Sequence, residues 1–145
     1  MTSKLLRLAC TALVLFGIYH ANVLLQTHLG KRVLAASELT VLPLSEALTQ
    51  AKIDQKPILV NISAIWCPGC RQLDKKVFAD ETFIKTMQSK ALFSRLEYES
   101  PEGEQFLKQH QLKGFPNLAL VGSDGRFLGP IQKPYSVSNI LAQLP

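Results

Sequence analysis

The most constraining feature of this sequence is a pair of cysteines placed directly after a strand-like segment. Residues 57–63, PILVNIS, are rich in β-branched residues and almost continuously apolar, which is typical of a strand buried on both faces. The chain then reads Trp66-Cys-Pro-Gly-Cys70, after which apolar residues recur at helical spacing. This pattern predicts a strand, a short loop and a helix whose N-cap lies at or near Cys67.

The position of the two cysteines suits disulfide exchange. Free backbone N–H groups at a helix start favour a thiolate at Cys67, and the thiolate is the attacking species in exchange. Pro68 fits the first helical position, and with Gly69 it forms the motif loop. One turn brings Cys70 within bonding reach, so Cys67 is predicted to form a mixed disulfide that Cys70 resolves. Trp66 is expected beside the sulfur as an apolar docking surface.

Two other uses of the cysteines are weaker alternatives. Structural zinc usually takes four Cys or His ligands, whereas residues 37–145 contain only Cys67, Cys70 and His110. We therefore expect no metal and no cofactor. A purely structural disulfide is the other alternative, but a ring this short constrains little of the unfolded chain.

The rest of residues 37–145 predicts alternating helices and strands. Gly122-Ser-Asp-Gly125 is typical of a hairpin turn. An α/β fold follows, with a mixed central sheet flanked by helices on both faces. The expected elements are a helix capped by Ser45, a helix starting at Asp80, a strand over 91–98, a helix from Ser100 to about His110, strands at 117–121 and 126–128, and a helix over 136–144.

Residues 1–36 are predicted to be a membrane segment with a short linker, and residues 37–145 a separate domain. The apolar run from Leu8 to Gly30 follows Lys4 and Arg7 and is long enough to cross a bilayer. A cleavage site at Val33-Leu-Ala-Ala36 lies far behind the apolar core, so an uncleaved anchor is favoured over a removed signal peptide. In both cases the domain is exported.

The net charge of +5 belongs mostly to this leader. Of the 16 Lys and Arg residues, four lie before residue 37, where no Asp or Glu occurs. The remaining domain is nearly neutral, which argues against binding to nucleic acid. We expect a monomer.

Several stretches together resemble the thioredoxin superfamily and are similar to the C-terminal periplasmic domain of the thiol:disulfide interchange protein DsbD. The similarity covers roughly residues 44–130, and a CxxC followed about 45 residues later by Gly-x-Pro is a specific combination. The stretches are Lys56-Pro-Ile-Leu-Val60, Trp66-Cys-Pro-Gly-Cys70, Leu73…Val77-Phe-Ala-Asp80 and Gly114-Phe-Pro116.

This resemblance implies a thioredoxin fold in which Pro116 is a cis-proline facing the cysteines. It also implies that Phe115, beside Pro116, offers backbone hydrogen bonds to a bound substrate chain. An ordinary trans-proline opening a strand is the alternative for Pro116.

The sequence departs from thioredoxins at two places. Asn61 stands where thioredoxins carry a buried aspartate, and an amide cannot accept the proton of the resolving thiol. The motif also reads Pro-Gly where thioredoxin has Gly-Pro, so thioredoxin's potential and partners do not transfer. Arg71 and Arg95 are interpreted as solvated surface residues, with positive charge near the sulfurs as the alternative.

The sequence therefore predicts a membrane-tethered thiol:disulfide oxidoreductase on the periplasmic side of the bacterial inner membrane. It would act on protein thiols and disulfides as a reductase or electron relay, with a membrane electron donor as a candidate partner. The alternative is a redox-inactive thioredoxin-like module that holds a partner in a groove between Trp66 and Pro116.

Overall fold

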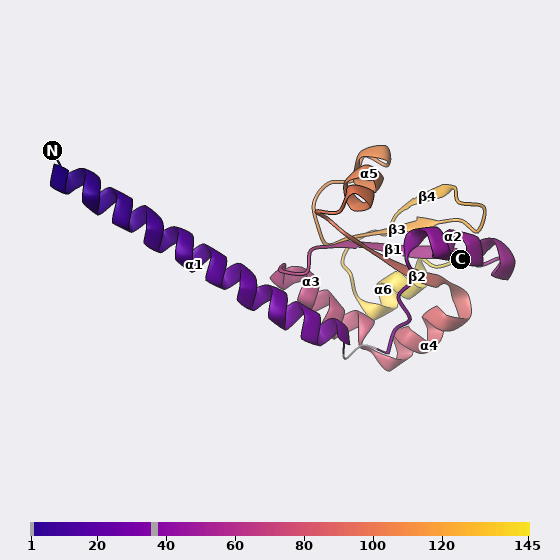
Figure 1. Ribbon diagram of the computed structural model, residues 1–145. Helices are drawn as coiled ribbons and strands as arrows, with labels where there is room; N and C mark the ends of the chain where they lie inside the picture. The colour runs from indigo at the N-terminus through magenta and orange to yellow at the C-terminus, as the bar shows by residue number, and fades with distance from the viewer. Residues whose placement is uncertain (1, 36–37) are drawn as a thin grey trace.

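The computed structural model describes residues 2–35 and 38–145, with side chains from Lys4 onward. A long N-terminal helix projects from an α/β domain (Figure 1). The elements in chain order are α1 (Thr2–Ala35), α2 (Leu44–Asp54), β1 (Ile58–Ser63), α3 (Pro68–Leu73), the π-helical turn η1 (Asp74–Phe78), α4 (Glu81–Lys90), β2 (Leu92–Glu97), α5 (Pro101–Gln109), β3 (Asn117–Val121), β4 (Phe127–Pro130) and α6 (Val137–Ala142).

The four strands form one mixed sheet in the order β2-β1-β3-β4. β1 runs parallel to β2 and antiparallel to β3, which pairs antiparallel with β4. β1 therefore has a neighbour on each side, and all six of its residues are buried. This confirms the predicted mixed sheet and places the strand before the cysteines at its centre.

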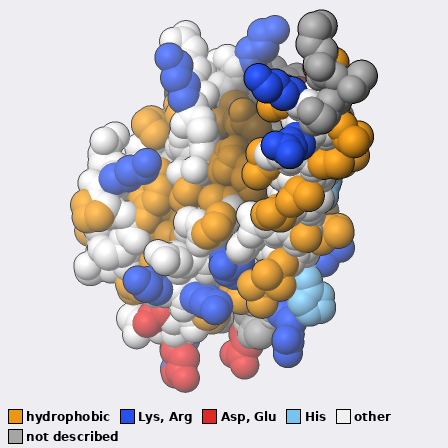
Figure 2. Space-filling view, turned by 90° about the vertical axis from the view of Figure 1, so that its left-hand side faces the viewer, with side chains coloured by type: hydrophobic (Ala, Val, Ile, Leu, Met, Phe, Trp, Pro, Cys, Tyr) orange, Lys and Arg blue, Asp and Glu red, His pale blue; other side chains and the backbone are white. Residues whose placement is uncertain are grey.

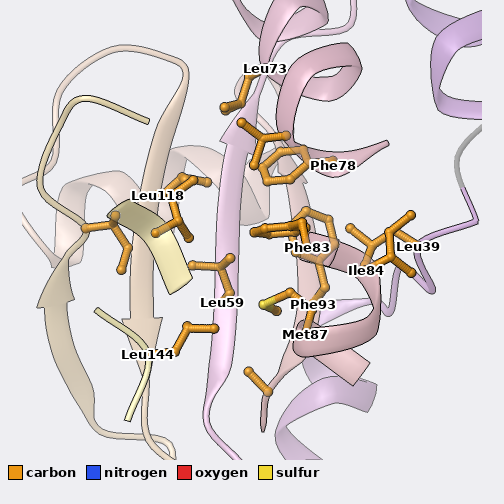
Figure 3. Packing of buried hydrophobic residues seen from close by; sticks show 14 of the residues in the cluster. Leu39, Leu59, Leu73, Phe78, Phe83, Ile84, Met87, Phe93, Leu118 and Leu144 are labelled. Carbon is orange, nitrogen blue, oxygen red and sulfur yellow. The ribbon is translucent and has the colours of Figure 1, made fainter. Parts of the chain in front are cut away.

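Two apolar cores lie on opposite faces of the sheet, because successive side chains of a strand point to opposite sides. Leu59 of β1 packs with Phe78, Phe83 and Phe93 in the core beneath α3, η1, α4 and α6 (Figure 3). Ile58, Val60 and Ile62 pack in the second core, together with residues of α2 and α5. Helices thus cover both faces, which confirms the packing predicted from the order of helices and strands.

Four helix starts are capped by the side chain that precedes them. The Cys67 sulfur and the side-chain oxygens of Asp80, Ser100 and Ser136 each accept a hydrogen bond from the backbone N–H three residues later. The predicted cap at Ser45 is wrong. The N-cap is Pro43, two residues earlier, and α2 begins at Leu44, because the carbonyl of Pro43 already accepts from the N–H of Ala47 at 2.8 Å.

The N-terminal segment is a single helix, and its stretch Lys4–Ala35 is long and apolar enough to cross a membrane. The part of α1 near its N-terminus stands clear of the domain, whereas its C-terminal end lies beside α3 (Figure 1). The predicted boundary between residues 36 and 37 lies outside the described residues.

Candidate active site

The cysteine motif sits in the turn that joins the central strand to α3. After β1 ends at Ser63, the chain bends so that the Cys67 N–H donates to the Ala64 carbonyl at 2.9 Å. Cys67 is the N-cap of α3, and its sulfur accepts a hydrogen bond from the Cys70 N–H at 3.2 Å. Pro68 occupies the first helical position, as predicted. Both thiols are free, and one helical turn separates them.

The two cysteines differ in exposure and therefore in chemistry. Cys67 is 8% exposed and borders the exposed residues Pro68 and Gly69, whereas Cys70 is 1% exposed. Burial, followed by the hydrogen bond with Cys67, raises the pKa of Cys70 to about 11. Hydrogen bonds from Ser63 and the Ala64 backbone oppose this rise. At neutral pH Cys70 is thus a thiol that must lose a proton before it can attack.

Aromatic rings form a wall beside the motif. The Trp66 and Phe115 rings meet edge-on with centroids 5.4 Å apart, and Tyr98 contacts Phe115 with centroids 4.5 Å apart. The Trp66 indole N–H donates to the carboxylate of Glu99 at 3.2 Å. Tyr98 was not predicted here, although it follows β2, whose end lies beside the end of β1 because the two strands are parallel.

Pro116 is brought against the motif from a distant part of the chain. The Phe115–Pro116 peptide bond is cis, so the trans alternative is wrong. A Cβ atom built on Gly69 would lie 3.8 Å from the Cys67 sulfur and 3.9 Å from Cδ of Pro116, which shows how closely the three residues approach. A shallow groove of about 190 Å³ continues from Gly69 and Pro116 past Lys76 and Tyr135.

A charged network is buried beneath the motif, and it centres on Arg95. The interpretation of Arg95 as a solvated surface residue is wrong: its side chain is 5% exposed. Its guanidinium donates to Oδ1 of Asp74 at 2.9 Å, Oγ of Ser63 at 2.7 Å and Oε1 of Glu97 at 3.2 Å. The Ser63 hydroxyl also forms a hydrogen bond with the Cys70 thiol. Ser63 therefore links the positive charge of Arg95 to Cys70.

Asp74 gives this network a titratable carboxylate one helical turn after Cys70. Burial raises the pKa of Asp74, and the charge and hydrogen bond of Arg95 oppose that rise. Glu97, at the other end, accepts from the N–H of Ile65 at 3.0 Å through Oε2. The network thus joins the loop before Cys67 to the helix after Cys70.

Asn61 lies on the face of β1 that carries Ser63, in register with Arg95 of β2. Its side chain is fully buried, and neither of its polar atoms has a hydrogen-bond partner among residues 2–35 and 38–145. Asn61 cannot titrate, and the hydrogen bonds that lower the pKa of the Cys70 thiol come from Ser63 and the Ala64 backbone. Over the same described residues, no three His, Cys, Asp or Glu side chains gather as a metal ion would require.

Comparison with protein families places the site in a known context. The family model described as thioredoxin-like matches residues 40–123, a stretch that contains the cysteine motif and Pro116. The thioredoxin-like protein HCF164 of Arabidopsis thaliana chloroplasts is 30% identical over 107 residues, which are 71% of this chain and 38% of that protein. The thiol:disulfide interchange protein DsbD 2 of Pseudomonas aeruginosa is 30% identical over 84 residues, 57% of this chain and 14% of its own length. The chain thus spans well under half of either relative.

Solved structures show the same fold at low sequence identity. A protein described as DsbH oxidoreductase superposes with a TM-score of 0.64 at 20% identity, covering 76% of this chain and 84% of that one. The C-terminal domain of Neisseria meningitidis DsbD in its oxidised form gives a TM-score of 0.57 at 20% identity, covering 71% of this chain and 95% of that domain.

Proposed function

Because the chain belongs to the thioredoxin-like family, we propose that it is a thiol:disulfide oxidoreductase acting on protein disulfides. The observation that carries the proposal is the asymmetric cysteine pair: Cys67, the N-cap of α3 with 8% of its surface exposed, lies one helical turn from Cys70, which is 1% exposed. The nearby aromatic wall and Pro116 support a role for Trp66, Phe115 and Pro116 in holding a substrate chain beside Cys67.

In the proposed reaction, the Cys67 thiolate attacks one sulfur of the substrate disulfide and releases the other as a thiolate. The Cys70 thiol then loses its proton and attacks the Cys67 sulfur. The second substrate thiolate leaves, and the Cys67–Cys70 disulfide remains. Two electrons pass to the substrate, which takes up two protons in total.

We propose that the protein works as a reductase or electron relay. A strong oxidant of this class needs a stabilised reduced form. Burial raises the pKa of Cys70 to about 11, so ionisation of that thiol does not stabilise the reduced form at neutral pH, and the reduction potential decides the direction. A Cys67–Cys70 reduction potential of about −270 mV or lower would support this direction, whereas a value near roughly −120 mV would contradict it.

The location is part of the same proposal: the segment of residues 1–36, which contains α1, stays as an anchor and holds the domain of residues 37–145 on the periplasmic side of the inner membrane. The apolar helix Lys4–Ala35 and the basic residues Lys4 and Arg7 near its start support this orientation. Detection of a quantitatively released product beginning near Ser37 would instead support a cleaved signal.

The function is tested by trapping and turnover. We expect the reduced protein to reduce a small protein disulfide, Cys70→Ser to accumulate a mixed disulfide through Cys67, and Cys67→Ser to form none. Quenched samples resolved by non-reducing electrophoresis and mass spectrometry identify the sulfur that is joined. If Cys67→Ser still binds a partner unchanged and the wild type shows no turnover, the protein is a binding module and the proposal fails.

A further inference from the structure

One side of the cysteine motif is covered by α1. Arg71 of α3 is half-buried, and its guanidinium donates a hydrogen bond to the side-chain oxygen of Gln26 in α1. α1 also meets the loop before the motif, where Gly30 is buried and a Cβ atom built on it would clash with the carbonyl oxygen of Ile65. A substrate chain therefore has no room on this side of α3.

The opposite side of α3 lines the shallow groove beside the motif. Its lining residues in α3 are spaced three or four apart, so they share a face of the helix on which Arg71 does not lie. They are Gly69, Gln72 and Leu73. The groove has a volume of about 190 Å³ and is also lined by Tyr135. A second groove of about 500 Å³ shares Tyr135 and borders the start of β3 at Asn117. We call the two together the Tyr135 groove.

Tyr135 belongs to a loop that is fixed to the rest of the domain. The Tyr135 hydroxyl accepts a hydrogen bond from the N–H of Leu118 at 3.3 Å. The side-chain amide of Asn139 in α6 donates to the backbone carbonyls of Gln132 and Pro134, both at 2.7 Å. The loop therefore presents its exposed side chains in a set position, which lowers the entropy cost of binding a partner there.

The Tyr135 groove is basic. It is lined by Lys76 of η1, Lys113 before β3 and Lys133 of the Tyr135 loop and, among the described residues, by no Asp or Glu. All three lysines are exposed, and over residues 4–35 and 38–145 none of them forms an ion pair. Lys133 lies over the Tyr135 ring, with Nζ 5.5 Å from the ring centroid. Three positive charges thus face solvent without an acidic partner.

The same charge pattern extends beyond the groove. Figure 2 shows the molecule from the side on which α3 lies in Figure 1. Lys and Arg side chains are spread over this face, whereas acidic side chains appear only along its lower edge. Charges of one sign around a groove attract ligands of the opposite sign and raise their rate of association.

We propose that the Tyr135 groove selects substrate polypeptides that carry Asp or Glu residues beside the reacting disulfide. This inference rests on the proposed function and names its substrate class. Because α1 covers the other side of α3, a chain that binds at Cys67 and continues past Gly69 meets the lysines. Gly69 is the link, since a Cβ atom built there would lie 3.8 Å from the Cys67 sulfur. The exchange itself is the two-step reaction described above and needs no other reactant.

The selection is measured with three peptides that differ only in the residues on both sides of one cysteine, which are Asp, Asn or Lys. The cysteine carries a thiopyridyl group, so attack by Cys67 on the peptide sulfur releases thiopyridone, and Cys70 then releases the peptide thiol. The full chain is used in neutral detergent micelles, with Cys10→Ser to remove the exposed third thiol.

We expect charge to set the rate of thiopyridone release. At about 0.01 M salt, where charges act over roughly 30 Å, the Asp peptide should react at least about tenfold faster than the Asn peptide, and the Lys peptide should be the slowest. At about 1 M salt the three rates should agree within about twofold, because charges are then screened beyond roughly 3 Å.

Two triple variants with the same change in net charge locate the effect. The groove variant is Lys76→Gln/Lys113→Gln/Lys133→Gln. The matched control removes three exposed lysines of α2 and α4 that do not line the Tyr135 groove, as Lys52→Gln/Lys85→Gln/Lys90→Gln. The groove variant should lose the preference for the Asp peptide, and the control should keep it. If both variants lost it to the same extent, or the groove variant kept it, the inference would fail.

The Asn peptide separates this inference from the proposed function. If the wild type reacts with all three peptides at similar rates through Cys67, the selection fails and the proposed function stands. If it reacts with none of them through Cys67, the proposed function fails and the inference fails with it.

A lipid surface is the other anion that three lysines could meet. Acetylation of the full chain in vesicles, followed by mass spectrometry, reports which lysines are covered. If the three peptides react alike and phosphatidylglycerol vesicles, unlike phosphatidylcholine vesicles, protect the three groove lysines, the surface binds lipid and the inference fails.

Discussion

The two faces of β1 carry different kinds of residue. Ile58, Val60 and Ile62 point into a core of mostly apolar side chains, against α2 and α5, in which the buried Ser94 is in register with Val60. On the opposite face, Leu59 is apolar, but the next two positions are Asn61 and Ser63, both fully buried. One face of β1 thus packs in an apolar core. The other face becomes polar toward the C-terminal end of the strand, which precedes the cysteines.

Within the six residues of β1, one face contributes mainly to the stability of the fold and the other to the surroundings of the cysteines. The apolar face contributes through burial and packing, and its residues belong to a different cluster from the one that contains the two cysteines. The polar face connects Ser63 to Cys70 and, through Arg95, to Asp74. Burying these groups costs free energy unless each is paired. Variants on the two faces should therefore change different properties, and four experiments test this.

The largest effect is expected from breaking the buried ion pair on the polar face. Arg95→Met leaves Asp74 and Ser63 without their charged partner, and unfolding should become easier by about 3–5 kcal/mol. The double variant Arg95→Met/Asp74→Leu should recover most of this loss, because no uncompensated charge remains. Urea denaturation of the reduced proteins gives both values. A loss below about 1 kcal/mol in the single variant would mean that the network does not hold this face together.

The next comparison uses two neighbouring residues on opposite faces. Ile62→Ala should destabilise the domain by about 2–4 kcal/mol through lost burial and a cavity, without changing exchange by the folded protein. Ser63→Ala should slow the attack of Cys70 about tenfold, because a hydrogen bond to the developing thiolate is lost. Denaturant melts and stopped-flow decay of the mixed disulfide measure the two properties. If Ile62→Ala also slowed resolution, the division between the faces would be wrong.

The pH dependence of stability should differ between the redox forms. Burial raises the pKa of Cys70 to about 11 from an ordinary 9.0, so the folded protein keeps a proton that the unfolded chain releases between these values. The reduced protein should lose on the order of 2 kcal/mol of stability as the pH rises through this range. In the oxidised protein Cys67 and Cys70 are joined, and the exposed Cys10, whose thiol is free in both forms, is the cysteine that remains, so this form serves as the control. Parallel curves for the two forms would contradict the buried-thiol assignment.

Much of this arrangement could be predicted from local patterns. Some signals in the sequence affect only neighbouring residues, and the structure has them at the predicted positions. They are the apolar run at β1, the helix starts at Asp80 and Ser100, and Pro68 after Cys67. The cap predicted at Ser45 was wrong because the backbone carbonyl of Pro43 accepts the first hydrogen bond of the helix. A backbone carbonyl is common to every residue, so the sequence gives no sign of this bond.

The polar network could not be predicted because its members meet only in the folded chain. Arg95 resembles a surface residue in sequence, and its burial depends on the parallel pairing of β1 with β2 and on Asp74 arriving from η1. The contact of Gly30 with Ile65 is equally non-local. A glycine in an apolar helix gives no sign of the backbone that it will meet.

The smallest effect is expected at Asn61, where the polar face lacks a titratable group. Asn61→Asp would place a carboxylate in a fully buried position, where its pKa rises and the protein loses stability near neutral pH. The same carboxylate could accept the Cys70 proton, so resolution of mixed disulfides should become about tenfold faster. Asn61→Leu is the control: it removes an unpaired buried amide and should stabilise the protein without changing the rate. Stopped-flow measurements on one small protein disulfide, with denaturant melts, compare all three.

An unchanged rate in Asn61→Asp would mean that the proton already leaves by another route. The variants Asp74→Asn and Glu97→Gln would then show which carboxylate of the Arg95 network receives the proton.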